Sequence, residues 1–336
     1  DMPLIKNIFC KIAPKIVSYI YHTPNIVCFS EYAKRLEGGT IILADVLSYY
    51  AASLGLYLIY HSDIKKSDEL KIKTAFVIAF FKVYIGILEE KEINKFSEFC
   101  SKEFMVKIPE NWVGYNVSDS FWNTFNAPSL LSLMFSNEGN LEPIDLDVLD
   151  DPFFYDDNED NPQLPTCLDE IKVCHAQILP QLRLSQILLT IHQNIIIHGP
   201  CDSGKTSFLD ILCQTNESII PIYIQASDSL DSQTIVQCIS SQTSLLSKAT
   251  MSNIGNKSYV LIFDGIEPHH VHIMEFIRMI LTNHTIPLIS PNDEKVFEFA
   301  TVHQCNVVVT TRDYKKLPTR FLVNFCPIQL HPITEL

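Results

Sequence analysis

Positive charge is scarce in this chain of 336 residues, which has 25 Lys and Arg against 39 Asp and Glu and a net charge of −14. Phosphate backbones and anionic membrane surfaces repel so acidic a protein, so we expect neither nucleic acid nor a membrane as its main partner. The most apolar segment, residues 75–88, contains Lys82 and is too short to span a bilayer. No signal peptide is evident, and because the first residue is Asp1 rather than Met we expect a piece of a longer protein.

Cysteine motifs are also missing. The ten cysteines include no C-x-x-C pair and form no regular framework, so we expect reduced, mostly buried thiols of a cytosolic protein. The acidic run over residues 145–160 lacks the spacing of an EF-hand calcium loop. A solvated linker is the interpretation that we favour there.

Composition and periodicity divide the chain into three regions. Residues 1–110 follow a helical pattern, with Ile5, Ile8, Ile12 and Ile16 on one helical face. Residues 71–88 are apolar nearly all round, which predicts the central helix of a bundle. Residues 111–165 are rich in Asn, Ser, Pro and acidic side chains and are expected to be an extended connection.

Residues 166–336 alternate short apolar runs with amphipathic segments. We predict strands over residues 195–197, 219–224, 259–263, 306–310 and 327–330, and helices over residues 169–191, 232–246 and 271–281. Buried strands that alternate with helices form a doubly wound parallel sheet. The expected fold class is therefore α/β, a parallel sheet flanked by helices and preceded by an all-α subdomain.

The most informative stretch follows the first of these strands. Gly199, Gly204, Lys205 and Thr206 fit the pattern G-x-x-x-x-G-K-[ST] between a strand and a helix, the context of a phosphate-binding loop. We expect Lys205 to contact the β- and γ-phosphates of ATP or ADP and Thr206 to hold Mg²⁺. The predicted nucleotide-contacting residues are Gly199, Pro200, Cys201, Asp202, Ser203, Gly204, Lys205, Thr206 and Ser207.

A second candidate is the acidic residue that closes a later strand. Asp264 follows an apolar run about sixty residues after Lys205 and is predicted to support the Mg²⁺. Many ATPases of this kind place a glutamate next, to orient the attacking water, but here that position is Gly265, which cannot polarise water. Glu267 lies two residues further on. Nucleotide binding without fast hydrolysis is thus the favoured hypothesis.

Three further groups have a predicted or alternative role. Thr310 and Thr311, at the tip of the fourth strand, are placed to contact the γ-phosphate or the water, or to serve only as strand-end hydrogen bonders. Arg320 is a candidate arginine finger, with a surface salt bridge as the alternative. His269, His270, His272 and Glu275 do not match a standard zinc pattern, so a polar loop and a first helical turn are favoured.

Together these motifs resemble the large subdomain of an AAA+ module, and more specifically the motor region of a dynein heavy chain. Residues 164–172 (LPTCLDEIK) are similar to the segment that precedes a phosphate loop in dyneins. Residues 75–88 resemble a helix of the preceding module's lid, and residues 317–330 (LPTRFLVNFCPIQL) resemble the end of a large subdomain.

The resemblance implies the end of a second module over residues 1–110 and the large subdomain of a third, regulatory module over residues 166–336. It also implies catalytic or supporting roles for Asp264, Thr311 and Arg320, with neighbouring AAA+ modules, intermediate and light chains and microtubules as partners. The implied location is the cytoplasm and its cytoskeleton, or a cilium. Two alternatives stay open: another phosphate-loop switch with a helical partner-binding domain, and a scaffold that no longer binds nucleotide.

Overall fold

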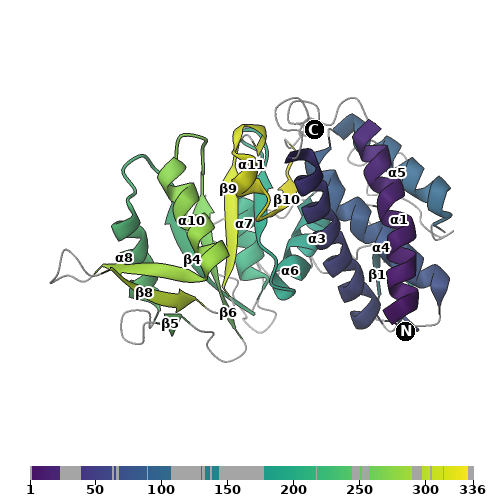
Figure 1. The fold of residues 1–336 in the computed structure, drawn as a ribbon, viewed down its shortest axis with the longest axis horizontal. Coiled ribbons are helices and arrows are strands. Elements are labelled where there is room, and N and C mark those ends of the chain that lie inside the picture. Colours follow the sequence, from purple (N-terminus) through teal and green to yellow (C-terminus); the bar gives the residue numbers. More distant parts are fainter. Residues whose placement is uncertain are drawn as a thin grey trace, which may run out of the picture. The chain divides into compact units, whose positions relative to one another are not determined.

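The protein is described by a computed structural model, shown in Figure 1. The residues that it describes are 2–22, 39–62, 64–65, 68–88, 90–106, 130, 133–136, 138–143, 178–216, 218–243, 250–251, 257–289, 297–302, 305–312 and 314–331. The chain forms two compact units, one of residues 1–184 with 333–336 and one of residues 185–332. The predicted motif at residues 164–172 and the acidic run at residues 145–160 lie outside the described residues.

The first unit is mainly helical. Its elements are α1 (Met2–His22), α3 (Gly39–His61), α4 (Glu69–Tyr84), the 3-10 turn η1 (Ile85–Ile87), α5 (Glu90–Phe104), and the antiparallel strands β1 (Leu133–Phe135) and β2 (Leu141–Pro143). Helix α6 (Leu179–Thr190) crosses from this unit into the second. No helix within the described ranges combines the length and the apolarity that crossing a membrane requires.

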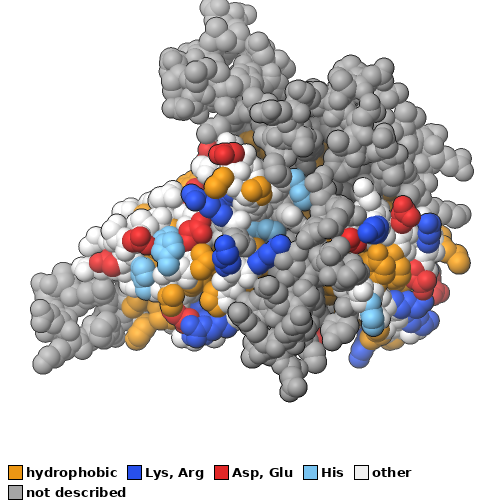
Figure 2. Space-filling view, turned by 90° about the horizontal axis from the view of Figure 1, so that it is seen from above, with side chains coloured by type: hydrophobic (Ala, Val, Ile, Leu, Met, Phe, Trp, Pro, Cys, Tyr) orange, Lys and Arg blue, Asp and Glu red, His pale blue; other side chains and the backbone are white. Residues whose placement is uncertain are grey.

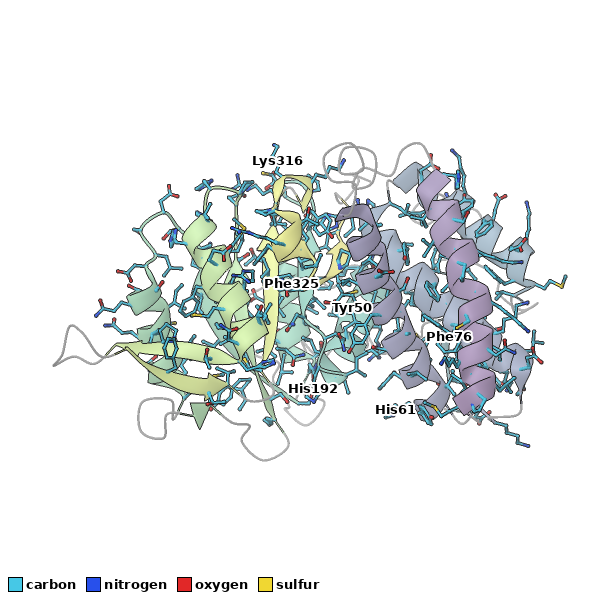
Figure 3. All side chains as sticks on the ribbon, viewed as in Figure 1. Tyr50, His61, Phe76, His192, Lys316 and Phe325 are labelled. Atoms are coloured by element: carbon cyan, nitrogen blue, oxygen red, sulfur yellow. The ribbon has the colours of Figure 1, made fainter. Side chains whose placement is uncertain are left out.

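Helix α4 is the centre of this unit, as the sequence predicts. Every residue from Thr74 to Tyr84 is buried, and α4 packs against α1, α3 and α5. Asp68 caps its first turn by accepting a hydrogen bond from Lys71 N at 3.1 Å. The ring of Phe76, labelled in Figure 3, packs edge-on against Phe9 and lies so close to Gly55 that a Cβ there would approach Cδ1 to 2.4 Å.

The second unit is an α/β fold. After α6 it contains β3 (Ile195–His198), α7 (Lys205–Gln214), β4 (Ile219–Gln225), α8 (Ser232–Gln242), β5 (Thr250–Met251), β6 (Ser258–Asp264), α10 (Val271–Asn283), β7 (Thr285–Ile289), β8 (Phe297–Val302), β9 (Asn306–Thr311), the turn η6 (Tyr314–Lys316), α11 (Thr319–Leu322) and β10 (Cys326–Gln329).

Five strands form a wholly parallel sheet in the order β10-β3-β9-β6-β4, so the predicted parallel sheet is confirmed. Strands β3 and β9 are buried along nearly their whole length, which is why they are continuous apolar runs. Helix α10 lies in front of the sheet and α7 behind it in Figure 1. Phe325, labelled in Figure 3, is fully buried just before β10.

The order of the strands decides what meets at their carboxyl ends. Strand β9 lies between β3, which leads into residues 199–204, and β6, which ends at Asp264. The tip of β9 therefore reaches the same edge of the sheet as both. A polar residue at that tip is placed between the loop and the carboxylate.

A second, smaller sheet was not predicted. Strands β7 and β8 pair antiparallel and β5 pairs parallel with β8. Strand β5 has only two residues, β7 contains Pro287, and β8 exposes Phe299 while it buries Ala300, so none of the three shows a clear apolar face in the sequence. Helix α8 also ends at Gln242, whereas the predicted helix extends to residue 246, beyond the described range that ends at residue 243.

Candidate functional site

The site is built around residues 199–206, here called the glycine loop. Strand β3 enters it and α7 begins at its end, at Lys205. Close packing requires glycine at position 199, because a Cβ there would lie 2.4 Å from Leu330 O and 2.8 Å from Ser203 Oγ. The backbone conformation favours glycine at position 204, because its φ of 73° lies in the left-handed region that glycine adopts without strain. Each glycine of the motif thus has its own physical reason.

Lys205 folds back over this loop. Its Nζ donates to Gly199 O at 2.9 Å, to Pro200 O at 2.6 Å and to Ser203 Oγ at 3.3 Å. Partial burial lowers the pKa of the Lys205 ammonium. A lysine has three N–H donors, so a phosphate oxygen in the loop would replace one of these acceptors without leaving a proton unpaired. The backbone N–H groups at the start of α7 add the positive end of a helix dipole.

The other predicted loop residues have different surroundings. Ser203 is buried at 2% exposure, whereas Pro200, Cys201, Asp202 and Ser207 are exposed. Asp202 has a φ of 61°, so the backbone turns through a left-handed conformation just before Ser203. Cys201 is a free thiol. Of the loop side chains, those of Ser203, Lys205 and Thr206 make the polar contacts of the site.

Asp264 is the meeting point of three elements. Thr206 of α7 donates from Oγ1 to Asp264 Oδ2 at 3.2 Å, and Thr310 of β9 donates from Oγ1 to Asp264 Oδ1. The Thr310 hydroxyl in turn accepts from Gly265 N at 2.8 Å. The carboxylate is thereby fixed on both oxygens. The prediction that Lys205, Thr206 and Asp264 belong to one site is consistent with this arrangement.

These donors suit a magnesium ion. Mg²⁺ is a hard cation that takes oxygen ligands and usually uses only one or two side chains of the protein together with phosphate and water. The Thr206 hydroxyl and the Asp264 carboxylate are two such oxygens 3.2 Å apart at the end of the glycine loop. The residues present therefore fit the ion that the sequence motif implies.

The structure separates the two threonines at the tip of β9. Thr310 faces Asp264, whereas the Thr311 side chain is fully buried and its Oγ1 has no hydrogen-bond partner among the described residues. Successive side chains of a strand point to opposite faces, so only one of the two can face the carboxylate. The geometry places Thr310, rather than Thr311, in the network around Asp264.

Gly265 follows Asp264 directly, and Glu267 is the next acidic residue along the chain. Gly265 has a φ of 84°, so it turns the chain sharply after Asp264 and supplies no side chain. Glu267 forms an ion pair with Arg312, with Oε1 3.5 Å from Nε. Its carboxylate is therefore engaged with a cation of the chain itself.

Arg320, the candidate arginine finger, lies in the short helix α11. One of its terminal nitrogens lies 2.7 Å from Glu275 Oε1 of α10, and Glu275 Oε2 also accepts from Arg278 Nε at 2.9 Å. Its side chain is 65% exposed. Arg320 takes no part in the hydrogen bonds around Asp264 that the structure describes, and its guanidinium is held by an ion pair within its own unit.

The histidines after β6 form a different cluster. His269 and His270 both place Nε2 near Asp228 Oδ1, at 3.0 and 3.4 Å. His272 instead contacts Leu230 O at 2.7 Å. In Figure 2, histidine side chains lie beside acidic ones over the part of the molecule that contains α8 and α10. Three potential metal ligands thus converge, with Asp228 contributed by a segment that the sequence did not indicate.

Protonation argues against a metal at this cluster. His270 Nδ1 accepts a hydrogen bond from Glu267 N at 3.1 Å, so this nitrogen has no proton. The proton of the neutral ring is then on Nε2, 3.4 Å from Asp228 Oδ1, so this nitrogen has no lone pair for a metal. Burial, followed by the neighbouring His269, lowers the pKa of His270 and favours this neutral ring. The cluster is a set of polar contacts in the turn that precedes α10, with His270 Nδ1 bonded to Glu267 N of that turn.

One polar residue at this edge was not identified from the sequence. Gln225, the last residue of β4, donates from Nε2 to Asp264 O at 3.2 Å. The only sequence signal for it is its place at the end of a strand, and only the pairing of β4 with β6 brings it beside Asp264.

No protein-family model matches this chain, and no significant match was found among curated proteins. Among solved structures, the chain is similar to a point mutant of RuvB from Thermotoga maritima, at 16% sequence identity and a TM-score of 0.35. That match covers 51% of this chain and 50% of the RuvB chain. A similarity of this size does not define a shared function.

Proposed function

We propose that the chain is an ATP- and ADP-binding AAA+ module that hydrolyses ATP slowly. One observation carries this proposal: Thr206 Oγ1 lies 3.2 Å from Asp264 Oδ2 at the end of a glycine loop closed by Lys205. The two residues are far apart in the sequence, and a parallel sheet with β9 inserted between β3 and β6 brings them together. A phosphate-loop lysine, a hydroxyl and a strand-end carboxylate are the groups that bind a magnesium nucleotide.

Each residue of the candidate site would have a defined role in this binding. The backbone of the glycine loop and the start of α7 surround the phosphates with N–H donors, and Lys205 adds its ammonium. Thr206 and Asp264 supply the oxygens that would hold Mg²⁺, which when bound neutralises phosphate charge. Thr310 and Gly265 N keep the Asp264 carboxylate in a single orientation.

Slow turnover follows from the residue after Asp264. Gly265 has no side chain to orient water, and Glu267 is paired with Arg312. Arg320, the candidate for a neighbour's site, is held by Glu275 within its own unit. A module built in this way retains nucleotide and responds to it rather than turning it over rapidly.

The finer assignment rests on the resemblance to dynein heavy chains. Two of its segments lie among the described residues: residues 75–88 belong to the buried part of α4 and to η1 with Leu88, and residues 317–330 run through α11 and β10. We infer a regulatory third module of a dynein-like motor, preceded by the helical end of the second module. Its partners would then be adjacent AAA+ modules in a ring and, through other parts of such a motor, associated chains and microtubules.

Calorimetric titration of the 336-residue chain with ATP and ADP, with and without Mg²⁺, tests nucleotide binding. We expect binding that Mg²⁺ strengthens and that Lys205→Ala weakens by a factor of about 100 or more, because the lysine contacts the phosphates directly. Lys257→Ala, which removes an exposed lysine outside the loop, is the matched control and should bind as the wild type does. A folded wild-type chain that binds neither ATP nor ADP would contradict the proposal.

A further inference from the structure

Gln225 lies beside the candidate site at a position set by strand pairing. It is the last residue of β4 and pairs in register with Asp264, the last residue of β6. Residues paired in register on neighbouring strands of a sheet direct their side chains to the same face. The Gln225 amide is therefore on the face on which Asp264 meets Thr206 of α7.

The amide is also fixed and exposed. Its Nε2 donates to Asp264 O at 3.2 Å, and this bond to a carbonyl identifies the nitrogen end of the amide. Oε1 is left as the acceptor of the group. The side chain is solvent-exposed, so water reaches it.

The position of this amide relative to Gly265 is informative. A Cβ on Gly265 would lie 3.4 Å from Gln225 Nε2. The Gln225 amide thus occupies the place next to the point where a side chain of residue 265 would begin, and where related ATPases are expected to carry the water-orienting glutamate. This amide therefore places a polar group beside residue 265, which has no side chain of its own.

We propose that Gln225 is the residue that orients the attacking water for the slow hydrolysis of ATP by this module. The inference rests on the proposed nucleotide-binding function. An amide oxygen accepts a hydrogen bond from water and aligns it, but an amide does not take up a proton at neutral pH. A glutamine aligns the attacking water in the same way in some GTPases.

The step balances without a further reactant. The water oxygen forms a bond to the γ-phosphorus while the bond from that phosphorus to the β,γ-bridging oxygen breaks, and its electron pair stays on ADP. The proton lost by the water passes to an oxygen of the departing phosphate. Because the loose transition state of phosphoryl transfer needs little proton abstraction, alignment alone gives a slow but measurable reaction.

Single-turnover hydrolysis of ATP by the full chain tests this role. We expect Gln225→Leu to hydrolyse bound ATP at least about tenfold more slowly, because it keeps the volume of the side chain and removes the acceptor. The affinity for Mg-ADP should stay within about twofold, whereas that for Mg-ADP with aluminium fluoride should fall by about the same factor as the rate. Gln233→Leu, on the exposed surface of α8, should change none of the three.

Two results would overturn the role of Gln225 and leave nucleotide binding intact. One is a Gln225→Leu variant that hydrolyses ATP at the wild-type rate. The other is a wild-type chain that binds ATP but hydrolyses it no faster than Lys205→Ala does. A folded wild-type chain that binds neither ATP nor ADP would instead refute the proposed function itself, so the two failures are distinguished by the binding measurement.

Discussion

At the scale of single residues, the Asp264 carboxylate is the best-defined feature of the candidate site. Both of its oxygens accept hydrogen bonds from hydroxyl groups, and the one from Thr310 is itself oriented by Gly265 N. The Thr310 hydroxyl accepts one hydrogen bond and donates one, so its proton direction is determined. Thr310 therefore positions Asp264 and, if Mg²⁺ binds as proposed, would position the ion through it.

Replacing Thr310 tests this positioning. Thr310→Val keeps the shape of the side chain and removes the hydroxyl, so we expect the Mg²⁺-dependent gain in ADP affinity to shrink by about tenfold, equivalent to ~1.4 kcal/mol. Thr310→Ser should retain the gain. Affinity measured without Mg²⁺ should be equal in all three proteins, and a Thr310→Val variant with the full Mg²⁺ effect would show that Asp264 needs no such support.

At the scale of secondary-structure elements, the notable feature is a lysine, Lys82, buried within helix α4. Lys82 has an exposed fraction of 0%, and burial lowers its pKa to about 7. In the unfolded chain the same ammonium titrates near its ordinary pKa of about 10.4. Between these two values the unfolded chain binds more protons than the folded one, so the destabilisation caused by Lys82 is complete below about pH 7 and declines as the pH rises.

Lys82→Met should remove this pH-dependent term, because methionine fills a similar volume without a charge. We expect the variant to exceed the wild type in free energy of unfolding at about pH 7, and the difference to shrink by up to ~1.4 kcal/mol per pH unit between about pH 7 and about pH 9. Urea unfolding followed by circular dichroism at several pH values measures both. A difference that stays constant over this range would mean that Lys82 does not lose its proton in the folded chain.

The elements also show what a sequence can predict. Ile195–Ile197 and the apolar runs at residues 259–263 and 306–310 are buried strands whose composition and flanking turns identify them, and each forms where the sequence predicts it. The two glycines of the loop could also be predicted, because the motif that contains them lies within a few consecutive residues. Strands β7 and β8 were missed because Pro287 weakens the strand signal of β7, and because β8 exposes Phe299 and buries Ala300 on its pairing with β7.

The side-chain partners within the site depend on non-local register. Nothing in the sequence distinguishes Thr310 from Thr311 as the partner of Asp264, because the face of β9 that each occupies is fixed by its pairing with β3 and β6. Gln225 meets Asp264 only through the pairing of β4 with β6. The convergence of Asp228 with His269 and His270 likewise joins two loops from separate strand ends.

At the scale of the whole molecule, the chain has two compact units, and the residues of the candidate nucleotide site belong to the second of them. The glycine loop, Asp264, Thr310 and Gln225 are all carried by α7 or by the carboxyl ends of four parallel strands. A site assembled at the edge of one sheet needs no other domain to bring its groups together. The second unit should therefore bind nucleotide through backbone groups of the loop itself.

Amide hydrogen exchange of the full chain, read out peptide by peptide, measures this most directly. If the loop N–H groups hold the phosphates, Mg-ATP should slow exchange in peptides covering residues 199–207 and leave peptides of α4 unchanged, and the effect should vanish in Lys205→Ala. Unchanged exchange across residues 199–207 at a concentration of Mg-ATP in the millimolar range would contradict the account, because no nucleotide could then be bound by this loop.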